Sequence, residues 1–234
     1  MKIRELAAEL SSSTYPGRGI LLGRSQDGSS AAIAYFIMGR SENSRNRVFI
    51  PTADGIQTKA FDESKMTDPS LIIYAPVRQI GGKTIVTNGD QTDTIYDFMS
   101  KGHCYRKALL TRTFEPDTPN FTPRISGIVK PNGDFNLSIL KSDDGCPDNT
   151  LRYFYEYENP KAGQGRYLHT YVGDGSPLPS FDGEPTPVTV PGTLEEFTDT
   201  IWQNLNPDNK VSLYTCFIDL QTGEHTWKIV NKNE

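Results

Sequence analysis

Short apolar runs separated by turn-forming residues recur along the first 141 residues of the chain. Asp27-Gly28, Asp54-Gly55 and Asn132-Gly133 stand where hairpin turns belong, and the last is the clearest hairpin signal. The pattern therefore predicts strands joined largely by hairpins. The runs with the length and composition of β-strands lie at residues 20–23, 31–38, 48–51, 71–77, 83–87, 124–130 and 135–141.

Apolar residues at helical spacing predict four helices, and a final hairpin is expected at residues 211–220 and 225–230. The last helix has the clearest ends, because Thr193 and Glu196 form a capping-box pattern and Asn206-Pro207 stops it. Strands and helices come in separate blocks rather than in strict alternation, which favours the α+β class with antiparallel sheet. The predicted helices cover residues 1–10, 92–100, 103–113 and 193–205.

Length and composition indicate one domain over residues 1–234 with a core that relies on aromatic side chains. Only 35% of the residues are hydrophobic, but the chain contains 11 Tyr, 11 Phe and 2 Trp. The segment 173–191 is rich in proline and glycine, so we expect an irregular surface excursion there. The N-terminal residues lack the apolar run of a signal peptide, and no stretch has the length of a membrane span. We expect a cytoplasmic protein without a membrane partner; the pattern does not fix an oligomeric state, and a homo-oligomer stays open.

The formal net charge of -5 argues against a nucleic-acid partner, which requires a basic surface. The charge is unevenly distributed, however. Residues 174–208 contain seven acidic and no basic residues, whereas residues 15–47 contain five arginines and only two acids, Asp27 and Glu42. Because guanidinium groups match phosphate and carboxylate oxygens bidentately, this arginine cluster is a candidate anion site. The alternative is a set of solvated arginines on the surface.

Two further clusters carry polar groups that could contact a ligand. Residues 87–93 are almost all polar and stand at a predicted strand-to-helix junction, where Gly89 permits close approach of the backbone and free N–H groups suit an anion. A helix cap on Asp90 or Asp93 would explain the same residues without a ligand. Glu115 precedes a proline-containing loop and is a candidate acid–base group, although most loop glutamates are merely solvated.

No metal or organic cofactor is expected from the motifs. His103, His169 and His225 are far apart, and the three cysteines are widely spaced without a CxxC pair. The chain also contains no GxSxG, Walker or GxGxxG motif.

Taken together, the clusters resemble the archaeal-type IMP cyclohydrolase family, most clearly over residues 15–130. The resemblance implies a four-layer αββα fold similar to N-terminal-nucleophile hydrolases but used without self-processing, and the chain indeed begins Met1-Lys2 rather than with a nucleophile. It also implies ring closure of 5-formamidoimidazole-4-carboxamide ribotide (FAICAR) to IMP with loss of water, without a cofactor. The matching motifs are Tyr15-Pro16-Gly17-Arg18-Gly19-Ile20, Gly39-Arg40-Ser41, Arg45-Asn46-Arg47, residues 87–95 and Thr122-Pro123-Arg124-Ile125.

The family pattern also suggests roles for individual positions. Arg45 is the expected catalytic donor, Tyr74 the hydroxyl donor to the formyl oxygen, and Glu115 the proton carrier. The other matching positions are expected to bind the purine ribotide, with the arginines near the phosphate. These substrate-binding candidates are Arg18, Arg40, Ser41, Asn46, Asn88, Gly89, Asp90, Thr92, Asp93 and Arg124.

Two other functions stay open at this point. An amidohydrolase of the N-terminal-nucleophile type would require a processed chain. A catalytically silent purine-nucleotide-binding protein would keep the anion site without turnover.

Overall fold

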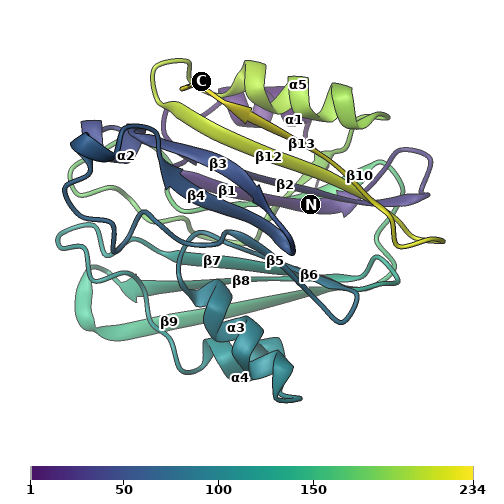
Figure 1. Ribbon diagram of the computed structural model, residues 1–234, viewed down its shortest axis with the longest axis horizontal. Helices are drawn as coiled ribbons and strands as arrows, with labels where there is room; N and C mark the ends of the chain where they lie inside the picture. Colours follow the sequence, from purple (N-terminus) through teal and green to yellow (C-terminus); the bar gives the residue numbers. More distant parts are fainter. Residues whose placement is uncertain (1, 234) are drawn as a thin grey trace.

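Alternate residues of strand β2 (Ser30–Met38) pack into two different cores, and this alternation explains the layers of the molecule. Ile33 and Tyr35 lie in the core between two β-sheets, whereas Ala34 and Phe36 lie in a second core on the opposite face of the same sheet. Successive side chains of a strand point to opposite faces, so a strand that is apolar on both faces must be covered on both. The computed structural model, which describes residues 2–233, shows this arrangement (Figure 1).

The two sheets are antiparallel throughout and pack face to face. The six-stranded sheet has the order β11-β10-β1-β2-β12-β13, and the seven-stranded sheet has the order β3-β4-β5-β6-β7-β8-β9. Besides β2, the first sheet contains β1 (Arg18–Arg24), β10 (Gln164–His169), β11 (Thr186–Thr189), β12 (Lys210–Asp219) and β13 (His225–Asn231). The second contains β3 (Arg47–Thr52), β4 (Gly55–Ala60), β5 (Val77–Ile80), β6 (Lys83–Thr87), β7 (Arg124–Val129), β8 (Phe135–Asp143) and β9 (Cys146–Tyr157).

Helices cover the outer face of each sheet (Figure 1). Helices α1 (Leu6–Ser11) and α5 (Leu194–Asn204) pack on the six-stranded sheet, and α3 (Gln91–Ser100) and α4 (Tyr105–Leu109) pack on the seven-stranded sheet. The order of layers is therefore helix, sheet, sheet, helix. Two short turns of helix, α2 (Glu42–Arg45) and the 3-10 turn η1 (Glu63–Lys65), lie in the connections on either side of the β3–β4 hairpin.

The structure confirms the α+β class and two mainly antiparallel sheets. Six of the seven predicted runs correspond to β1, β2, β3, β6, β7 and β8, and the predicted final hairpin is β12–β13. Helix α5 begins with the expected capping box, in which the Thr193 side chain accepts from the Glu196 N–H and the Glu196 carboxylate accepts from the Thr193 N–H.

One predicted strand was wrong for a physical reason. Of residues 71–77 only Val77 belongs to a strand, β5. The Tyr74 N–H donates to the side-chain Oγ1 of Thr58 at 2.8 Å rather than to a backbone carbonyl of a neighbouring strand. Pro76 has no N–H to donate. The predicted helix at residues 103–113 is also shorter, because α4 covers only Tyr105–Leu109.

Residues 146–189 contain three strands, β9, β10 and β11, that the pattern did not predict. The segment 173–191 is correspondingly more ordered than an irregular excursion, because it includes the edge strand β11 and buries Phe181 and Val188. Pro187 is accommodated there because an edge strand leaves one set of backbone groups unpaired. Within residues 2–233, no helix has both the length and the apolar character needed to cross a membrane.

Candidate active site

Glu115 is a buried carboxyl group beside two arginines. It lies in the loop between α4 and β7, where its backbone N–H donates to the Thr122 carbonyl at 2.9 Å, and only 2% of the residue is exposed. Burial raises the pKa of Glu115 to about 7, against the opposing charges of Arg18 and Arg124. A carboxyl group with this pKa can both release and accept a proton near neutrality.

Arg18, the first residue of β1, lies beside this carboxyl group. Burial alone would lower the pKa of Arg18, but the negative charge of Glu115 raises it above the usual value. Its Nε–H is buried and has no hydrogen-bond partner among the described residues. An arginine in this state has an N–H group directed into the interior and available to a ligand acceptor.

Arg47, the first residue of β3, is fully buried, and its two terminal nitrogens lack hydrogen-bond partners among the described residues. Its Nε donates to the Ser44 carbonyl at 2.8 Å, but neither Nη1 nor Nη2 has a hydrogen-bond partner within residues 2–233. Burial lowers the pKa of Arg47, and the nearby charge of Arg18 lowers it further. The two guanidinium groups are thus close enough to repel each other, which an anionic or oxyanionic ligand between them would relieve.

A pair of tyrosine hydroxyls completes the buried cluster. The hydroxyls of Tyr35 and Tyr74 are 2.7 Å apart. Burial raises the pKa of Tyr35, and the adjacent Tyr74 contributes, whereas the charges of Arg18 and Arg47 oppose the rise. Because one hydroxyl of such a pair donates to the other, one O–H proton is left for a ligand.

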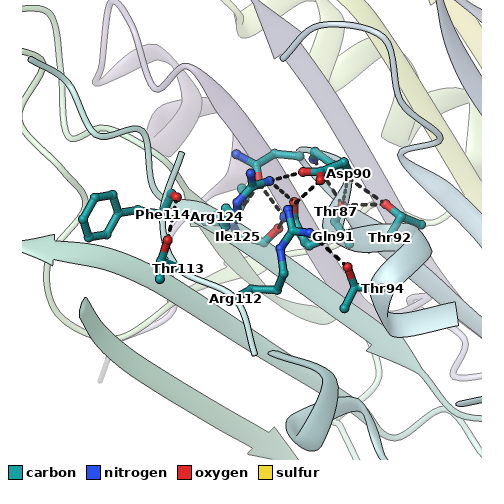
Figure 2. A network of polar contacts seen from close by, with 12 residues as sticks. Thr87, Asp90, Gln91, Thr92, Thr94, Arg112, Thr113, Phe114, Arg124 and Ile125 are labelled. Atoms are coloured by element: carbon teal, nitrogen blue, oxygen red, sulfur yellow. Dashed lines mark hydrogen bonds and ion pairs between the residues drawn. The ribbon is translucent and has the colours of Figure 1, made fainter. Parts of the chain in front are cut away.

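The strand-to-helix junction at residues 87–93 is bound by hydrogen bonds to Arg112 and to Arg124 of β7 (Figure 2). Arg124 donates through Nη1 to Asp90 at 2.6 Å and to Gln91 at 2.8 Å. A Cβ atom added to Gly89 would lie 2.8 Å from the Arg124 Nη1 and 3.1 Å from the Glu115 Oε1. A side chain at position 89 would therefore displace the ends of the Gln91 and Arg124 side chains and crowd Glu115, so glycine suits this close approach.

Asp90 connects two arginines at the edge of the site (Figure 2). Its carboxylate accepts from Arg112 and from Arg124, both at 2.6 Å. Partial burial would raise the pKa of Asp90, but the hydrogen bond from Arg112 and the charge of Arg124 lower it below the usual value. This ion-pair network fixes Arg124 beside Glu115.

Most other polar groups of the junction hold the backbone. Asn88 is fully buried; its amide donates to the Pro123 carbonyl and accepts from the Ile125 N–H. Thr92 is also fully buried and shares a 2.6 Å hydrogen bond with Thr87. These contacts explain part of the polarity of the junction without a ligand. The expected side-chain cap is not formed, because Asp90 is the N-cap residue of α3 but makes no side-chain cap hydrogen bond, and Asp93 pairs with Arg78.

Five sequence-predicted residues lie outside the buried cluster. Arg45 is exposed and donates to the Gly39 carbonyl and to Asn209. Asn46 is buried, but both ends of its amide bind the backbone of Asp62. The remaining three are exposed, and each has a structural partner: Ser41 caps α2, Asp93 pairs with Arg78, and Arg40 pairs with Asp174 above the Tyr15 ring.

Of the neighbouring arginines Arg45 and Arg47, it is Arg47 that lies in the interior, whereas Arg45, the expected catalytic donor, is exposed. The sequence holds a signal for this exchange, because Arg47 and Phe49 are two residues apart in β3 and therefore point to the same face. Phe49 belongs to the core between the sheets, so its partner on that face is also buried. Extending the alternation of the predicted strand at residues 48–51 back by one residue would have predicted that Arg47 is buried.

The Glu115, Arg47, Tyr35 and Tyr74 side chains of the cluster are buried, and Arg18 is partly exposed. Two sizeable cavities lie elsewhere. A cavity of about 600 Å³ lies between the β8–β9 hairpin and residues 177–182, and another of about 600 Å³ lies against β3 and β4. Within the described residues there is no group of three His, Cys, Asp or Glu side chains arranged to hold a metal ion. The side chains of the cluster itself offer hydrogen-bond donors and, at Glu115, a group that can transfer a proton.

Comparisons with known proteins identify one family over most of the chain. Residues 15–224 match a family model described as "IMP cyclohydrolase-like protein". The chain is 30% identical to an IMP cyclohydrolase of Halobacterium salinarum, over 63% of this chain and 76% of that protein. It is 31% identical to an IMP cyclohydrolase of Methanopyrus kandleri, over 71% of this chain and 79% of that protein. A third relative, the IMP cyclohydrolase of Methanococcus aeolicus, is 28% identical over 67% of this chain and 74% of its own length.

Proposed function

The chain belongs to the IMP cyclohydrolase-like family, and from that premise we propose that it is an IMP cyclohydrolase whose active site is the cluster around Glu115. The reaction closes the purine ring: the carboxamide nitrogen of FAICAR attacks the formyl carbon, and water leaves to give IMP. The substrate carries both reacting groups, so the protein must orient them, stabilise the developing oxyanion and move protons.

Arg47 and Tyr74 are our candidates for stabilising the oxygen of the formyl group. The unpartnered Nη1 and Nη2 of Arg47 and the Tyr35–Tyr74 hydroxyl pair present buried donors that need no reorganisation when negative charge develops. Arg47 here replaces Arg45, whose guanidinium is engaged at the surface. Tyr74 keeps the role that the family pattern suggested.

Glu115 is our candidate for the proton carrier. Its carboxyl group, with a pKa of about 7, can accept the proton released by the attacking nitrogen and return one to the departing hydroxyl. Arg18, next to Glu115, would bind an anionic part of the substrate through its unpartnered Nε–H.

The remaining expected residues divide into two groups. Arg40, on the exposed rim over Tyr15, is a candidate for binding the 5′-phosphate. The phosphate would replace Asp174 as the ion-pair partner of Arg40. Asn88, Gly89, Asp90, Thr92 and Arg124 shape the junction that lies against Glu115, and we assign to them the positioning of the base and ribose side of the site. The layer order of helix, sheet, sheet, helix also supports a fold of the N-terminal-nucleophile hydrolase type.

The single observation that carries the proposal is the burial of Glu115 with two arginines whose N–H groups lack partners. A core that serves packing alone would not retain such groups, because an unpaired buried donor destabilises the folded state. An active site would retain these N–H groups, because they can stabilise negative charge that develops in the transition state.

A turnover assay with purified protein and FAICAR tests the proposal. We expect IMP to accumulate with or without a metal chelator, and to see no cleavage of simple amides. An amidohydrolase would show a mass reduced by removal of an N-terminal segment, together with amide cleavage. A silent binder would show a thermal shift with IMP that Glu115→Gln and Tyr74→Phe do not change, and no turnover.

A further inference from the structure

A chain of three hydrogen-bonded side chains ends at the active-site cluster, and neither the family pattern nor the sequence motifs assigned it. Asp117 accepts from the Thr122 N–H at 2.6 Å through Oδ1 and from the Thr122 hydroxyl through Oδ2. The Thr122 Oγ1 is also 2.5 Å from the hydroxyl of Tyr171. Tyr171 is 1% exposed, so its phenolic oxygen lies in the interior.

The direction of the hydrogen bonds follows from the chemistry of the three groups. A carboxylate only accepts, so the Thr122 hydroxyl gives its one proton to Asp117. The Thr122 oxygen can then only accept from Tyr171, which must donate its own proton. The phenolic oxygen of Tyr171 therefore keeps lone pairs and has no proton left for a ligand.

The Tyr171 oxygen lies among the charged groups of the site. Burial raises the pKa of Tyr171, the charge of Arg18 opposes the rise, and Glu115 is near enough to contribute to it. The ring is held rigidly, because it stacks on Tyr15 at a centroid distance of 6.1 Å. A Cβ atom at Gly17 would lie 2.5 Å from the same ring, so only glycine permits this approach.

We propose that Tyr171 is a substrate-contacting residue that presents an acceptor-only oxygen to an N–H or O–H group of the purine ribotide, and that Asp117 and Thr122 are positioning residues that fix this polarity. The inference rests on the proposed function for the identity of the ligand. It adds a specificity element: a ligand that offers an acceptor at this point, rather than a donor, is rejected because two lone pairs would meet.

Asp117 has a second effect through its charge. The groups whose charges act on Glu115 are Arg18 of β1, Arg124 of β7, Asp90 of the strand-to-helix junction and Asp117 of the loop itself. The two aspartates raise the pKa of Glu115 and the two arginines lower it. Asp117→Asn removes one charge that raises the pKa, so the limb of the pH–rate profile that reports Glu115 should move to lower pH. This sign holds whether Glu115 acts as acid or as base.

The experiment compares kcat/KM for FAICAR and the affinity for IMP across four variants. We expect Tyr171→Phe and Thr122→Val to lower both by roughly tenfold, since each removes or reverses one buried hydrogen bond. Thr122→Ser keeps the hydroxyl and should behave as the wild type. Asp117→Asn should show a similar loss together with the pH shift, which the neutral changes at 122 and 171 should not produce.

Matched controls separate this role from general damage. Tyr155→Phe removes a hydroxyl that donates to the Gly183 carbonyl at 2.8 Å on the surface, and Asp134→Asn removes a carboxylate that accepts from Asn159 in a turn. Neither should change kcat/KM more than twofold. Thermal unfolding of every variant confirms that the compared proteins are folded.

The outcomes distinguish the two proposals. Wild-type turnover with unchanged kinetics and IMP affinity in Tyr171→Phe would overturn the assigned polarity, as would a Thr122→Ser variant as impaired as Thr122→Val. An absence of wild-type turnover would overturn the proposed function instead. In that case IMP affinity still decides the role of Tyr171: a tenfold loss in Tyr171→Phe supports it, and an unchanged affinity overturns it.

Discussion

Arg47 shows at the level of one residue how stability and activity diverge in this protein. A buried guanidinium with unpartnered Nη atoms destabilises the fold, and replacing a buried charged group with an apolar one of similar volume is often neutral or stabilising. We therefore expect Arg47→Met to keep or raise the melting temperature while it lowers kcat by about 10²–10³-fold.

Arg45→Ala is the matched comparison, because the family pattern assigns the role of catalytic donor to Arg45. Its exposed guanidinium donates to the Gly39 carbonyl and to Asn209, so we expect kcat to change no more than about threefold, the size of a surface effect below 1 kcal/mol. Parallel kinetics and thermal unfolding of the two variants decide between the arginines. A larger loss of kcat in Arg45→Ala than in Arg47→Met would return the catalytic role to Arg45.

Glu115 should make stability fall as pH rises. Its pKa is about 7 in the folded protein and 4.5 for an ordinary glutamate, so between these values the folded chain retains a proton that the unfolded chain has released. The free energy of unfolding then falls from about pH 4.5 to 7, and the full loss is present above pH 7. Because glutamine resembles the protonated form, Glu115→Gln should be more stable than the wild type at pH 8, by up to about 3 kcal/mol.

Chemical denaturation at pH 4 and pH 8 measures this difference. The gain should vanish at pH 4, where both proteins are neutral at this position. Glu158→Gln, at an exposed glutamate, serves as the control and should show no pH-dependent gain. Equal stability of Glu115→Gln and wild type at pH 8 would mean that Glu115 is not held at a raised pKa.

At the level of elements, the irregular segment of residues 71–76 positions the side chain of Tyr74. Residues 71–76 are held by Thr58 of β4, whose Oγ1 donates to the Ile72 carbonyl and accepts from the Tyr74 N–H, both at 2.8 Å. We expect Thr58→Val to lower the free energy of unfolding by about 1–3 kcal/mol, because both groups lose a buried partner. Since Tyr74 would be displaced, kcat should fall as well.

Thr58→Ser is the matched variant, because it retains the hydroxyl. Kinetics and denaturation of the pair test the coupling between strand β4 and Tyr74. If Thr58→Val lost stability but kept the wild-type kcat, the position of Tyr74 would not depend on this contact.

The sequence predicts the elements that local features determine and misses those that depend on tertiary contacts. Strand β2 and helix α5 are predicted well because alternation and the Thr193–Glu196 capping box are local features. Strand β9 is only partly buried along its length and carries no clear apolar run, so its pairing with β8 is a tertiary feature. The prediction of a strand at residues 71–77 was wrong because the Tyr74 N–H donates to the side chain of Thr58 in β4, and this hydrogen bond fixes the segment in an irregular conformation.

The candidate site was only partly predictable for a similar reason. Glu115, Tyr74, Arg18 and Arg124 were found by motif and are brought together by the fold. Which of the neighbouring arginines enters the interior is settled by the register of β3, and the role of Tyr171 depends on a contact with Thr122, 49 residues earlier. Neither relation is local in the sequence.

At the level of the whole molecule, strands of one sheet contribute to two cores, and the N-terminal segment pairs with the late strand β11. β1 and β2 contribute to both faces of the six-stranded sheet. Arg4 pairs with residues 187 and 189 through backbone hydrogen bonds of 2.9 and 3.0 Å. We propose that residues 1–234 form one domain and therefore expect a single cooperative unfolding transition.

Calorimetry tests this expectation through the ratio of the calorimetric to the van't Hoff enthalpy, which should be close to one. A ratio well above one, or separate transitions for tryptophan fluorescence and far-ultraviolet circular dichroism, would show independent units instead.

The central claim is that the buried cluster of Glu115, Arg47 and Tyr74 closes the purine ring. The most direct test is the single-turnover conversion of FAICAR to IMP at pH 7 by the wild type and by Glu115→Gln, with IMP binding measured on both. We predict conversion by the wild type and a rate lower by about 10²–10⁴-fold in the variant, with IMP binding retained. Equal rates in the two proteins, or no conversion by a folded wild type that binds IMP, would contradict the claim.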